Sequence, residues 1–408
     1  MLECPERDTG LTDRDLIAAA RSGGNARDIR RAIVKDKFLE ARKLFPITKH
    51  VGYFNHAGVS PFSTKVAAAL ARHVLEQTTY GGTVEPRWAK RVEEARREAA
   101  RLVNASPKEI AFVDNTTQGL NYFARGIAWK RGDNVVLPRI EFPANVYPWL
   151  SLKERGVRIK FVPDRDGRIL VEDIERAIDT RTRIVAVSFV EFSSGYRNDL
   201  AGIGKICSKR GPYLVVDGIQ GLGALRLDVK ECLIDGLSAG GHKWLLAPQG
   251  TGIFYCSSRV IDELVHPTPG WLSVVGWDNY YDFDYKLFPD SRRYEPAQKN
   301  LIGIAGLNEA LKMINGLGIE SVEKRIIDVT DHLCRLLAGR GFSVYSPRGD
   351  GEKSGIVSFS PRRGDAERVC AKLLRQGFWT AARQGRIRVS PHFYNTREEM
   401  ESLVRALP

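Results

Sequence analysis

The stretch 235-DGLSAGGHKWLLAPQGTG-252 joins an apolar strand pattern, which ends in two glycines, to His242, Lys243 and an apolar turn. A surface lysine requires neither the glycines before it nor the Trp-Leu-Leu after it. A nucleophilic lysine benefits from both, because glycine permits close approach to a flat ligand and a partly dry pocket lowers the lysine pKa. A phosphate-binding P-loop is a poor match, since that motif places Ser or Thr after its Gly-Lys. The stretch therefore predicts a reactive Lys243.

The composition is that of a globular protein of about two domains, with 408 residues of which 43% are hydrophobic. No run of about 18 apolar residues predicts a membrane span. The N-terminus is polar and acidic, unlike a signal peptide. The six cysteines are scattered without a CxxC pair, so we expect neither a disulfide framework nor a zinc site, and a cytoplasmic location. The seven histidines contain no pair at helical metal-ligand spacing, so no metal site is expected.

The net charge of +13 would suit an anionic partner such as nucleic acid. The arginines, however, are interleaved with Asp and Glu along the whole chain, as in VEEARREAARL at 92–102, which is typical of solvated helix faces. We therefore expect a small-molecule enzyme, and keep a nucleic-acid-binding regulator only as a distant alternative.

Apolar, β-branched runs alternate with helical patterns between residues 51 and 299, which predicts a mostly parallel sheet with helices on both faces. From residue 300 onward, two long helical patterns and the strand patterns FSVYS, GIVSFS and RIRVS predict a smaller α+β domain, residues 300–408. Residues 1–50 form a predicted N-terminal helical arm that joins the small domain, with Thr12 as a helix cap. The fold class is thus α/β, with a large sheet domain over 51–299.

Two further groups of residues follow predicted strands and can reach the same sheet edge as Lys243. Asp217 ends the strand pattern YLVVD, with Gln220 just beyond; a buried carboxylate there needs a partner, although capping of the next element is an equally good interpretation. Thr116 and Thr117 open a helix after the strand pattern IAFV, which makes either a phosphate site or a simple helix cap.

A lysine, a carboxylate for a ring nitrogen and a helix end for a phosphate are together the requirements of pyridoxal 5'-phosphate (PLP). In this setting the sequence resembles the class V aminotransferase family, which includes cysteine desulfurases, kynureninase and isopenicillin N epimerase-like enzymes. The matching motifs stand in family order between about residues 52 and 405: YFNHAGVSPF, FVDNTTQGLN, EFPANVYPW, VSFVEFSSGYRNDL, VVDGIQGLGALRLDV, GGHKWLLAPQGTGIFY, RRYEPAQKN and RIRVSPHFYNTREEM. The resemblance implies the type I fold of PLP-dependent transferases, with a seven-stranded, mostly parallel sheet.

The resemblance also implies roles around the cofactor. Lys243 would form the Schiff base and later move the Cα proton, and Asp217 would pair with the pyridine nitrogen. Gln220 would bind the ring oxygen. The phosphate would be held by His242, Thr117 and the amide of Thr116.

Further roles concern the substrate and a second subunit. Phe142 would stack on the ring, where desulfurases have a histidine, but it cannot carry protons. Arg388 would hold the substrate carboxylate, to which its planar fork is suited. Asn55 and His56 lie in the FNHAG turn near the substrate, although His56 could equally well only cap that turn. Gln298 would reach the phosphate of the other subunit in a homodimer.

Departures from the family pattern limit the types of reaction that we expect. Desulfurases carry a cysteine on a loop shortly before the arginine strand, whereas the corresponding segment FWTAARQGRIRVS has none and Cys370 lies upstream in a predicted helix. Gly240 and Phe189 replace polar residues common in relatives. The aromatic residues Trp271, Trp277, Tyr280 and Tyr281 could line a substrate pocket or pack at a dimer seam.

The sequence therefore predicts an enzyme that acts at Cα or Cβ of an amino acid, with an epimerase-, aminotransferase- or lyase-type outcome that stays open. A carbon–sulfur lyase that releases sulfur without an enzyme persulfide is the second hypothesis. Substrate and stereochemistry are not determined by the sequence.

Overall fold

The computed structural model describes residues 37–408, so Thr12 and most of the predicted N-terminal arm lie outside the described residues. Residues 37–42 are helical, and the short 3-10 helix η1 follows at Pro46–Lys49. Phe45 is buried and stacks on Tyr394 with ring centroids 4.0 Å apart, so this segment packs on the C-terminal region. None of the helices in the described part of the chain combines the length and the hydrophobicity that a membrane crossing needs.

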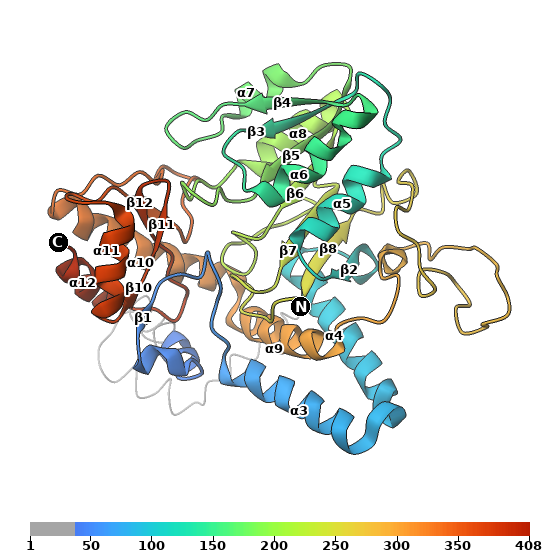
Figure 1. Ribbon diagram of the computed structural model, residues 1–408, viewed down its shortest axis with the longest axis horizontal. Helices are drawn as coiled ribbons and strands as arrows, with labels where there is room; N and C mark the ends of the chain where they lie inside the picture. Colours follow the sequence, from blue (N-terminus) through green and yellow to red (C-terminus); the bar gives the residue numbers. More distant parts are fainter. Residues whose placement is uncertain (1–36) are drawn as a thin grey trace, which may run out of the picture.

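One large sheet of seven strands forms the centre of the molecule (Figure 1). Its order is β2-β8-β7-β6-β5-β3-β4, and every neighbouring pair is parallel except the two that involve β8. The carboxyl ends of β7, β6, β5 and β3 therefore meet at one edge, where ligands bind in open α/β sheets. The strands are β2 (Ile110–Val113), β3 (Asn134–Pro138), β4 (Arg158–Val162), β5 (Thr182–Ser188), β6 (Tyr213–Asp217), β7 (Gly236–Gly240) and β8 (Gly252–Cys256).

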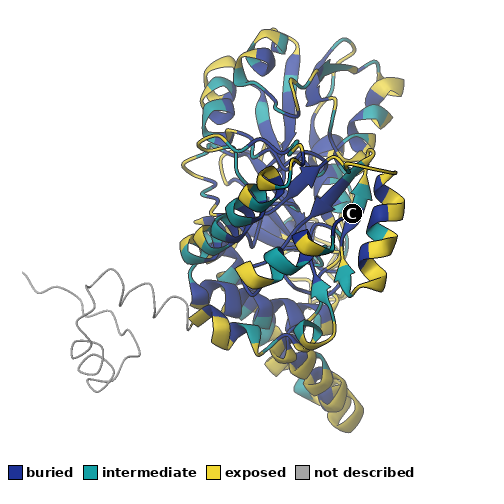
Figure 2. Cartoon of the chain, turned by 90° about the vertical axis from the view of Figure 1, so that its left-hand side faces the viewer, coloured by how far each residue is buried: buried dark blue, intermediate teal, exposed yellow. Residues whose placement is uncertain are grey.

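Apolar residues line both faces of this sheet, because successive side chains of a strand point to opposite sides. Val185 and Val187 belong to one buried cluster, which also contains residues of α4, α7, α8 and α9, whereas Ile184 and Ala186 belong to the second, with residues of α5 and α6. Figure 2 shows the resulting layers, with buried strands between helices that are exposed on their outer faces. The helices are α4 (Glu85–Val103), α5 (Thr116–Gly126), α6 (Tyr147–Leu150), α7 (Val171–Ala177), α8 (Leu200–Arg210) and α9 (Leu301–Leu317).

A smaller unit follows α9, which itself packs against α4 and against α3 (Thr64–Tyr80). Its three-stranded antiparallel sheet has the order β11-β12-β9, and a third buried cluster joins this sheet to α10, α11 and α12. The elements are α10 (Ile319–Gly339), β9 (Val357–Phe359), α11 (Ala366–Arg375), β11 (Ala381–Arg383), β12 (Arg386–Val389) and α12 (Arg397–Ala406).

Residues 52–60 connect the two units. The short strand β1 (Gly52–Tyr53) pairs in parallel with β10 (Phe378–Trp379), and Asn55 forms a bridge with Ser390. The early chain is thus held by a segment that lies more than 300 residues later. The division into residues 1–50, 51–299 and 300–408 stays a prediction.

The predicted α/β class and the type I sheet are confirmed. The strand predicted at FSVYS is wrong in extent, because within the described residues its only β-bridge is the isolated one from Val344 to Phe359. The segment after β3 contains only short helical pieces: η4 (Pro143–Asn145), α6 and η5 (Ser151–Arg155). The prolines in this segment remove amide donors and limit how far a regular helix can extend.

Candidate active site

Lys243 lies three residues beyond the end of β7, in a turn that is fixed from several sides. The Gly241 amide donates to the Thr251 carbonyl at 2.7 Å, and a Cβ at Gly241 would lie 3.0 Å from Ala247 Cβ, tighter than a normal contact. The Ser60 hydroxyl donates to the Lys243 carbonyl at 2.6 Å. Lys243 itself is only 9% exposed. The two glycines and the turn therefore aim a buried lysine into the sheet edge.

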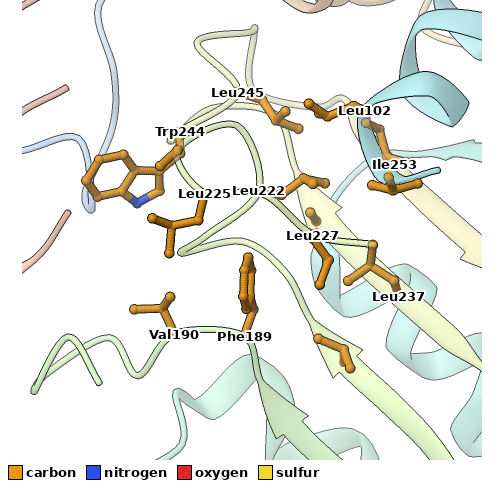
Figure 3. Close-up of a cluster of buried hydrophobic side chains, with 14 of the residues drawn as sticks. Leu102, Phe189, Val190, Leu222, Leu225, Leu227, Leu237, Trp244, Leu245 and Ile253 are labelled. Carbon is orange, nitrogen blue, oxygen red and sulfur yellow. The ribbon is translucent and has the colours of Figure 1, made fainter. Parts of the chain in front are cut away.

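The residues after Lys243 form a buried, apolar wall beside it. Trp244 and Leu245 are buried, and Figure 3 shows Trp244 in one apolar cluster with Phe189, Leu222 and Leu225. The Trp-Leu-Leu that follows the lysine in the sequence is thus core, which explains why apolar residues stand beside a charged one.

Asp217 ends β6, the strand next to β7, and is 1% exposed. Its Oδ1 accepts the Ile219 amide at 3.0 Å, while its buried Oδ2 has no hydrogen-bond partner in the described part of the chain. Burial raises the pKa of Asp217 to about 6, an increase that the Ile219 amide and the charge of Lys243 limit. An orphaned buried carboxylate oxygen is unusual, and it leaves an acceptor free for a cationic or N–H group of a ligand.

Burial lowers the pKa of Lys243 to about 8. The charge of Asp217 opposes this decrease, and those of Arg388 and Arg383 add to it. A substantial fraction of neutral amine is therefore present near neutral pH, which is what a lysine nucleophile requires.

The N-terminus of α5 lies beside the end of β7. Its cap is Asn115, whose side chain accepts the Gln118 amide at 3.0 Å, so neither threonine has that role. Thr116 instead accepts the Gly240 amide at 2.9 Å, which brings the first turn of α5 close to His242. Burial and the charge of Lys243 lower the pKa of His242. A helix N-terminus beside a neutral imidazole suits a phosphate group.

Gln220 is buried and holds two neighbouring segments together. Its Nε2 donates to the Ala57 carbonyl at 3.1 Å and its Oε1 accepts the Trp244 indole at 3.0 Å. One amide N–H remains for a ligand.

Phe142 reaches the lysine from the loop after β3. The Lys243 Nζ lies 5.4 Å from the centre of the Phe142 ring, and the ring packs edge-on against Phe192. Phe142 is 42% exposed, so one of its faces is free to cover a flat ligand.

Arg388 on β12 is the most unusual cation of the site. It is 2% exposed and donates to the Phe192 carbonyl at 2.9 Å and to Asn55 Oδ1 at 3.4 Å, and its buried Nε has no hydrogen-bond partner among the residues that the structure describes. No carboxylate of residues 37–408 forms an ion pair with it. Burial, with the charge of Arg383, lowers the pKa of Arg388 to about 9. A buried, unpaired guanidinium is costly, and a ligand carboxylate would remove that cost.

His56 is buried with both ring nitrogens occupied. Nδ1 contacts the Ser390 carbonyl at 2.8 Å and Nε2 contacts the Tyr394 hydroxyl at 2.6 Å. Burial, with the neighbouring His392, lowers its pKa well below the ordinary value. Both nitrogens thus tie the FNHAG turn to the segment after β12 and do not cap the turn itself, and a substrate contact by His56 stays a prediction.

Gln298 is not brought to Lys243 within one chain. It lies instead on the wall of a cavity of about 180 Å³ together with Asp114 and Gln118. Its predicted role was in another subunit, so it stays a prediction.

Sequence reasoning missed Ser60, Glu141 and Glu191. Ser60 holds the lysine turn, and the two glutamates are buried near Asp217. Glu141 and Glu191 lie three residues beyond the ends of β3 and β5, and no local pattern marks them, because their burial depends on which strands become neighbours in the sheet.

Taken together, the residues fit PLP. The orphaned Asp217 Oδ2 suits the ring nitrogen, the α5 N-terminus suits the phosphate, and Phe142 suits the ring face. Lys243 suits the aldehyde carbon.

The sequence pattern of the family described as "Aminotransferase class-V" matches residues 53–406. The chain belongs to the class V aminotransferase family. It is therefore a PLP-dependent enzyme by family, and the predicted family is confirmed.

Among its class V relatives is a probable cysteine desulfurase of Methanothermobacter thermautotrophicus, 30% identical over 90% of this chain and 96% of the relative. An uncharacterized aminotransferase of Schizosaccharomyces pombe is 28% identical over 90% of this chain and 94% of the relative. The apo structure of a cysteine desulfurase from Thermococcus onnurineus NA1 has a TM-score of 0.83 at 26% identity and covers 90% of this chain and 96% of the other.

Proposed function

We propose that the protein binds PLP between Lys243 and Asp217 and uses it to act at Cα or Cβ of an amino acid. The observation that carries the proposal is the pair itself: a buried lysine with a lowered pKa stands beside a buried aspartate whose Oδ2 has no hydrogen-bond partner within residues 37–408. The Arg388 guanidinium supports an amino acid as substrate, because it forms no ion pair within residues 37–408 and can pair with a substrate carboxylate.

When bound, PLP supplies an electron sink for the bond that breaks at the substrate Cα. Arg388 would hold the substrate carboxylate and so orient the substrate Cα. Lys243 would take the Cα proton on its neutral amine. Asp217 would be charged and stabilise a protonated ring nitrogen, and Phe142 would cover the ring. Trp244 and its buried neighbours limit the entry of water.

Three outcomes can follow once the Cα proton has been removed. Its return to Cα on the other face gives an epimer, its delivery elsewhere leads to amino-group transfer, and the loss of a β-substituent gives a lyase. The placement of acid groups decides among them.

The cofactor proposal is tested with purified protein supplied with PLP. We expect the visible absorbance band of PLP linked to a lysine, and its loss in Lys243→Ala. Lys205→Ala, an exposed lysine on α8, is the matched control and keeps the band. An unchanged band in Lys243→Ala would falsify the lysine assignment.

The reaction type is tested by incubation with a panel of L-amino acids in deuterated water, followed by mass spectrometry. We expect at least one amino acid to gain deuterium at Cα, and the product identifies the outcome. A complete lack of exchange across the panel, with PLP bound, contradicts action at Cα.

A carbon–sulfur lyase is the second candidate, because relatives are named probable cysteine desulfurases and this chain has no cysteine after Cys370. Cys370 lies on α11, and burial raises the pKa of its thiol, which makes it a poor nucleophile. Sulfide release from cysteine or cystine that persists in Cys370→Ser is the expected result. Loss of that release in the variant would mean that the thiol takes part.

We further propose that the working unit is a homodimer. The segment 265–285, here called the aromatic segment, extends away from the body on the right of Figure 1. Its exposed apolar side chains form a surface of the kind that partner chains cover: Val265, Trp271, Val275, Trp277, Tyr280, Tyr281, Phe283 and Tyr285.

Sedimentation at micromolar concentration tests this proposal, and we expect twice the chain mass of 45.6 kDa. The double variant Tyr281→Ser, Phe283→Ser is expected to shift the protein toward monomer, whereas Leu374→Ser, an exposed leucine on α11, leaves the mass unchanged. A monomeric wild-type protein contradicts the proposal.

A further inference from the structure

Three acidic side chains meet below the Lys243 site. Glu141 follows β3, Glu191 follows β5 and Asp217 ends β6, and these strands are consecutive neighbours in the sheet. Their exposed fractions are 6%, 0% and 1%. Three carboxyl groups enclosed in one place cannot all be ionised without cationic partners.

Hydrogen bonds join the two glutamates through the end of β5, where Ser188 also lies opposite Asp217. Ser188 donates its amide and its hydroxyl to the two oxygens of Glu141, each at 2.5 Å. Asn198 donates to Glu191 Oε1 at 2.9 Å and to the Ser188 carbonyl at 2.8 Å. Ser188 is also the register partner of Asp217.

Two oxygens of this cluster, Glu191 Oε2 and Asp217 Oδ2, are buried without a partner in the described residues. Since Asp217 Oδ2 is the acceptor left for the ring nitrogen of PLP, the cluster stands directly behind the cofactor's counter-ion. The charges of the two glutamates would therefore act on the ring nitrogen through Asp217.

The three carboxyl groups of the cluster experience different neighbouring charges. The strongest ones on Glu191 are those of Asp217 and of Asp164 beyond β4, and the strongest ones on Glu141 are those of Glu191 and Asp217. Lys243, after β7, acts on Asp217. Asp217 is thus the first of the three to ionise.

Burial raises the pKa of Glu191 to about 8 and that of Glu141 well above its ordinary value, and the neighbouring carboxylates add to both shifts. Glu191 is accordingly a neutral acid below about pH 8 and a carboxylate above it.

We propose that Glu191 is a positioning residue that acts through Asp217. Glu191 is protonated at neutral pH. Its ionisation adds negative charge behind Asp217 and strengthens the electrostatic stabilisation of a protonated ring nitrogen. Glu141 stays neutral and keeps the cluster from carrying a third charge. This inference rests on the proposed function, because the ring nitrogen belongs to PLP.

The first experiment uses the protein without added cofactor. Infrared difference spectra between about pH 7 and pH 9 are expected to show loss of a carboxylic-acid C=O band in the wild type, centred on the Glu191 pKa of about 8, and no such loss in Glu191→Gln. Glu109→Gln is the matched control, since Glu109 is also buried but lies at the start of β2 and accepts the Ser106 and Ser258 amides. Identical difference spectra in wild type and Glu191→Gln overturn the proposal.

The second experiment adds PLP labelled with ¹⁵N in its ring. We expect its nitrogen resonance to move toward the protonated form over the same pH range in the wild type, to stay constant in Glu191→Gln, and to move again in Glu191→Asp. A purely structural glutamate would leave the pH profile unchanged in Glu191→Gln, and that result overturns the coupling even where the infrared band is lost. A wild-type protein that takes up no PLP is a different failure, because it contradicts the proposed function itself.

Discussion

At the residue scale, the site depends on two groups whose charges control each other. Lys243 is buried and its pKa is lowered to about 8, while the charge of Asp217 keeps that pKa from falling further. The neutral amine is the reactive form, so the pH dependence of cofactor capture reports this balance directly.

The rate of PLP capture by the unloaded protein is predicted to rise about tenfold per pH unit below pH 8 and to level off above it. In Asp217→Asn the plateau should begin at a lower pH, because the charge that raises the lysine pKa is gone. Stopped-flow absorbance measures both profiles. A plateau that moves to higher pH in the variant contradicts the electrostatic account.

A second residue-scale prediction concerns Arg388. Arg388→Ala should raise the KM for amino acids roughly tenfold to a hundredfold, the range expected for a lost charge-assisted hydrogen bond of about 1.5–3 kcal/mol. Arg388→Lys keeps the charge and should lose less. The matched amines without a carboxylate serve as the control substrates, and an equal loss for them contradicts carboxylate binding.

How much of the site the sequence could predict differs between its residues. Lys243 and Asp217 carry local signals, a Gly-Gly turn and a strand that ends in a carboxylate. Glu141 and Glu191 do not, because their burial depends on which strands become neighbours in the sheet. His56 had a polar side chain in a suggestive turn, yet its two nitrogens serve Ser390 and Tyr394, which lie more than 330 residues away.

At the element scale, the close packing of α5 on the sheet places the helix end that the phosphate needs. Gly119 lies on the inner side of α5, where an added Cβ would be 2.4 Å from Ser238 Oγ and 2.8 Å from Phe254 Cδ2. Glycine is required here by the distance between helix and sheet.

Gly119→Ala is therefore predicted to destabilise the protein by about 1–3 kcal/mol through overpacking, and to weaken PLP binding because α5 must move. Gly316→Ala in α9 is the matched control, since no atom of residues 37–408 outside its own helix turn lies within 4 Å of its added Cβ, and it should be neutral or stabilising by about 1 kcal/mol. Urea unfolding and a PLP titration measure both effects. An equal response of the two variants contradicts the packing argument.

The alternation of buried strands with helices over residues 51–299 was predictable, whereas the short extent of pairing at FSVYS, residues 342–346, was not. Its alternation is that of a strand, but within the described residues it forms one β-bridge, from Val344 to Phe359, and amide bonds from Tyr345 and Ser346 to the Ser358 carbonyl. A strand pattern records that a segment could pair, and tertiary packing decides whether a partner strand is available.

At the scale of the whole molecule, one buried ion pair joins α4 to the segment before α9. Arg96 Nη1 and Nη2 lie 2.7 and 3.1 Å from the Glu295 oxygens, and both side chains are 3% exposed. Although burial favours the neutral acid, Arg96 and Lys299 hold the pKa of Glu295 below its ordinary value.

Glu295→Gln is predicted to cost about 3–5 kcal/mol of unfolding free energy at pH 7, because it removes the buried partner of Arg96 and leaves that buried charge only the more exposed carboxylate of Glu93. Glu93→Gln removes the exposed carboxylate that also pairs with Arg96, and it should cost no more than about 1 kcal/mol. The wild-type contribution is present above the ordinary glutamate pKa and is lost as the pH falls, so the two proteins should converge in acid. Denaturant unfolding as a function of pH tests this, and a constant difference down to acid pH contradicts it.

The connection made by residues 52–60 has a consequence for biosynthesis. Ser60 supports the Lys243 turn, while Asn55 and β1 are held by residues 378–390. A nascent chain that has already released the whole seven-stranded sheet from the ribosome still lacks the arginine strand and the anchor of its own early segment. All seven strands are present once β8 (Gly252–Cys256) has been made, yet the site becomes competent only when residues 378–390 have followed.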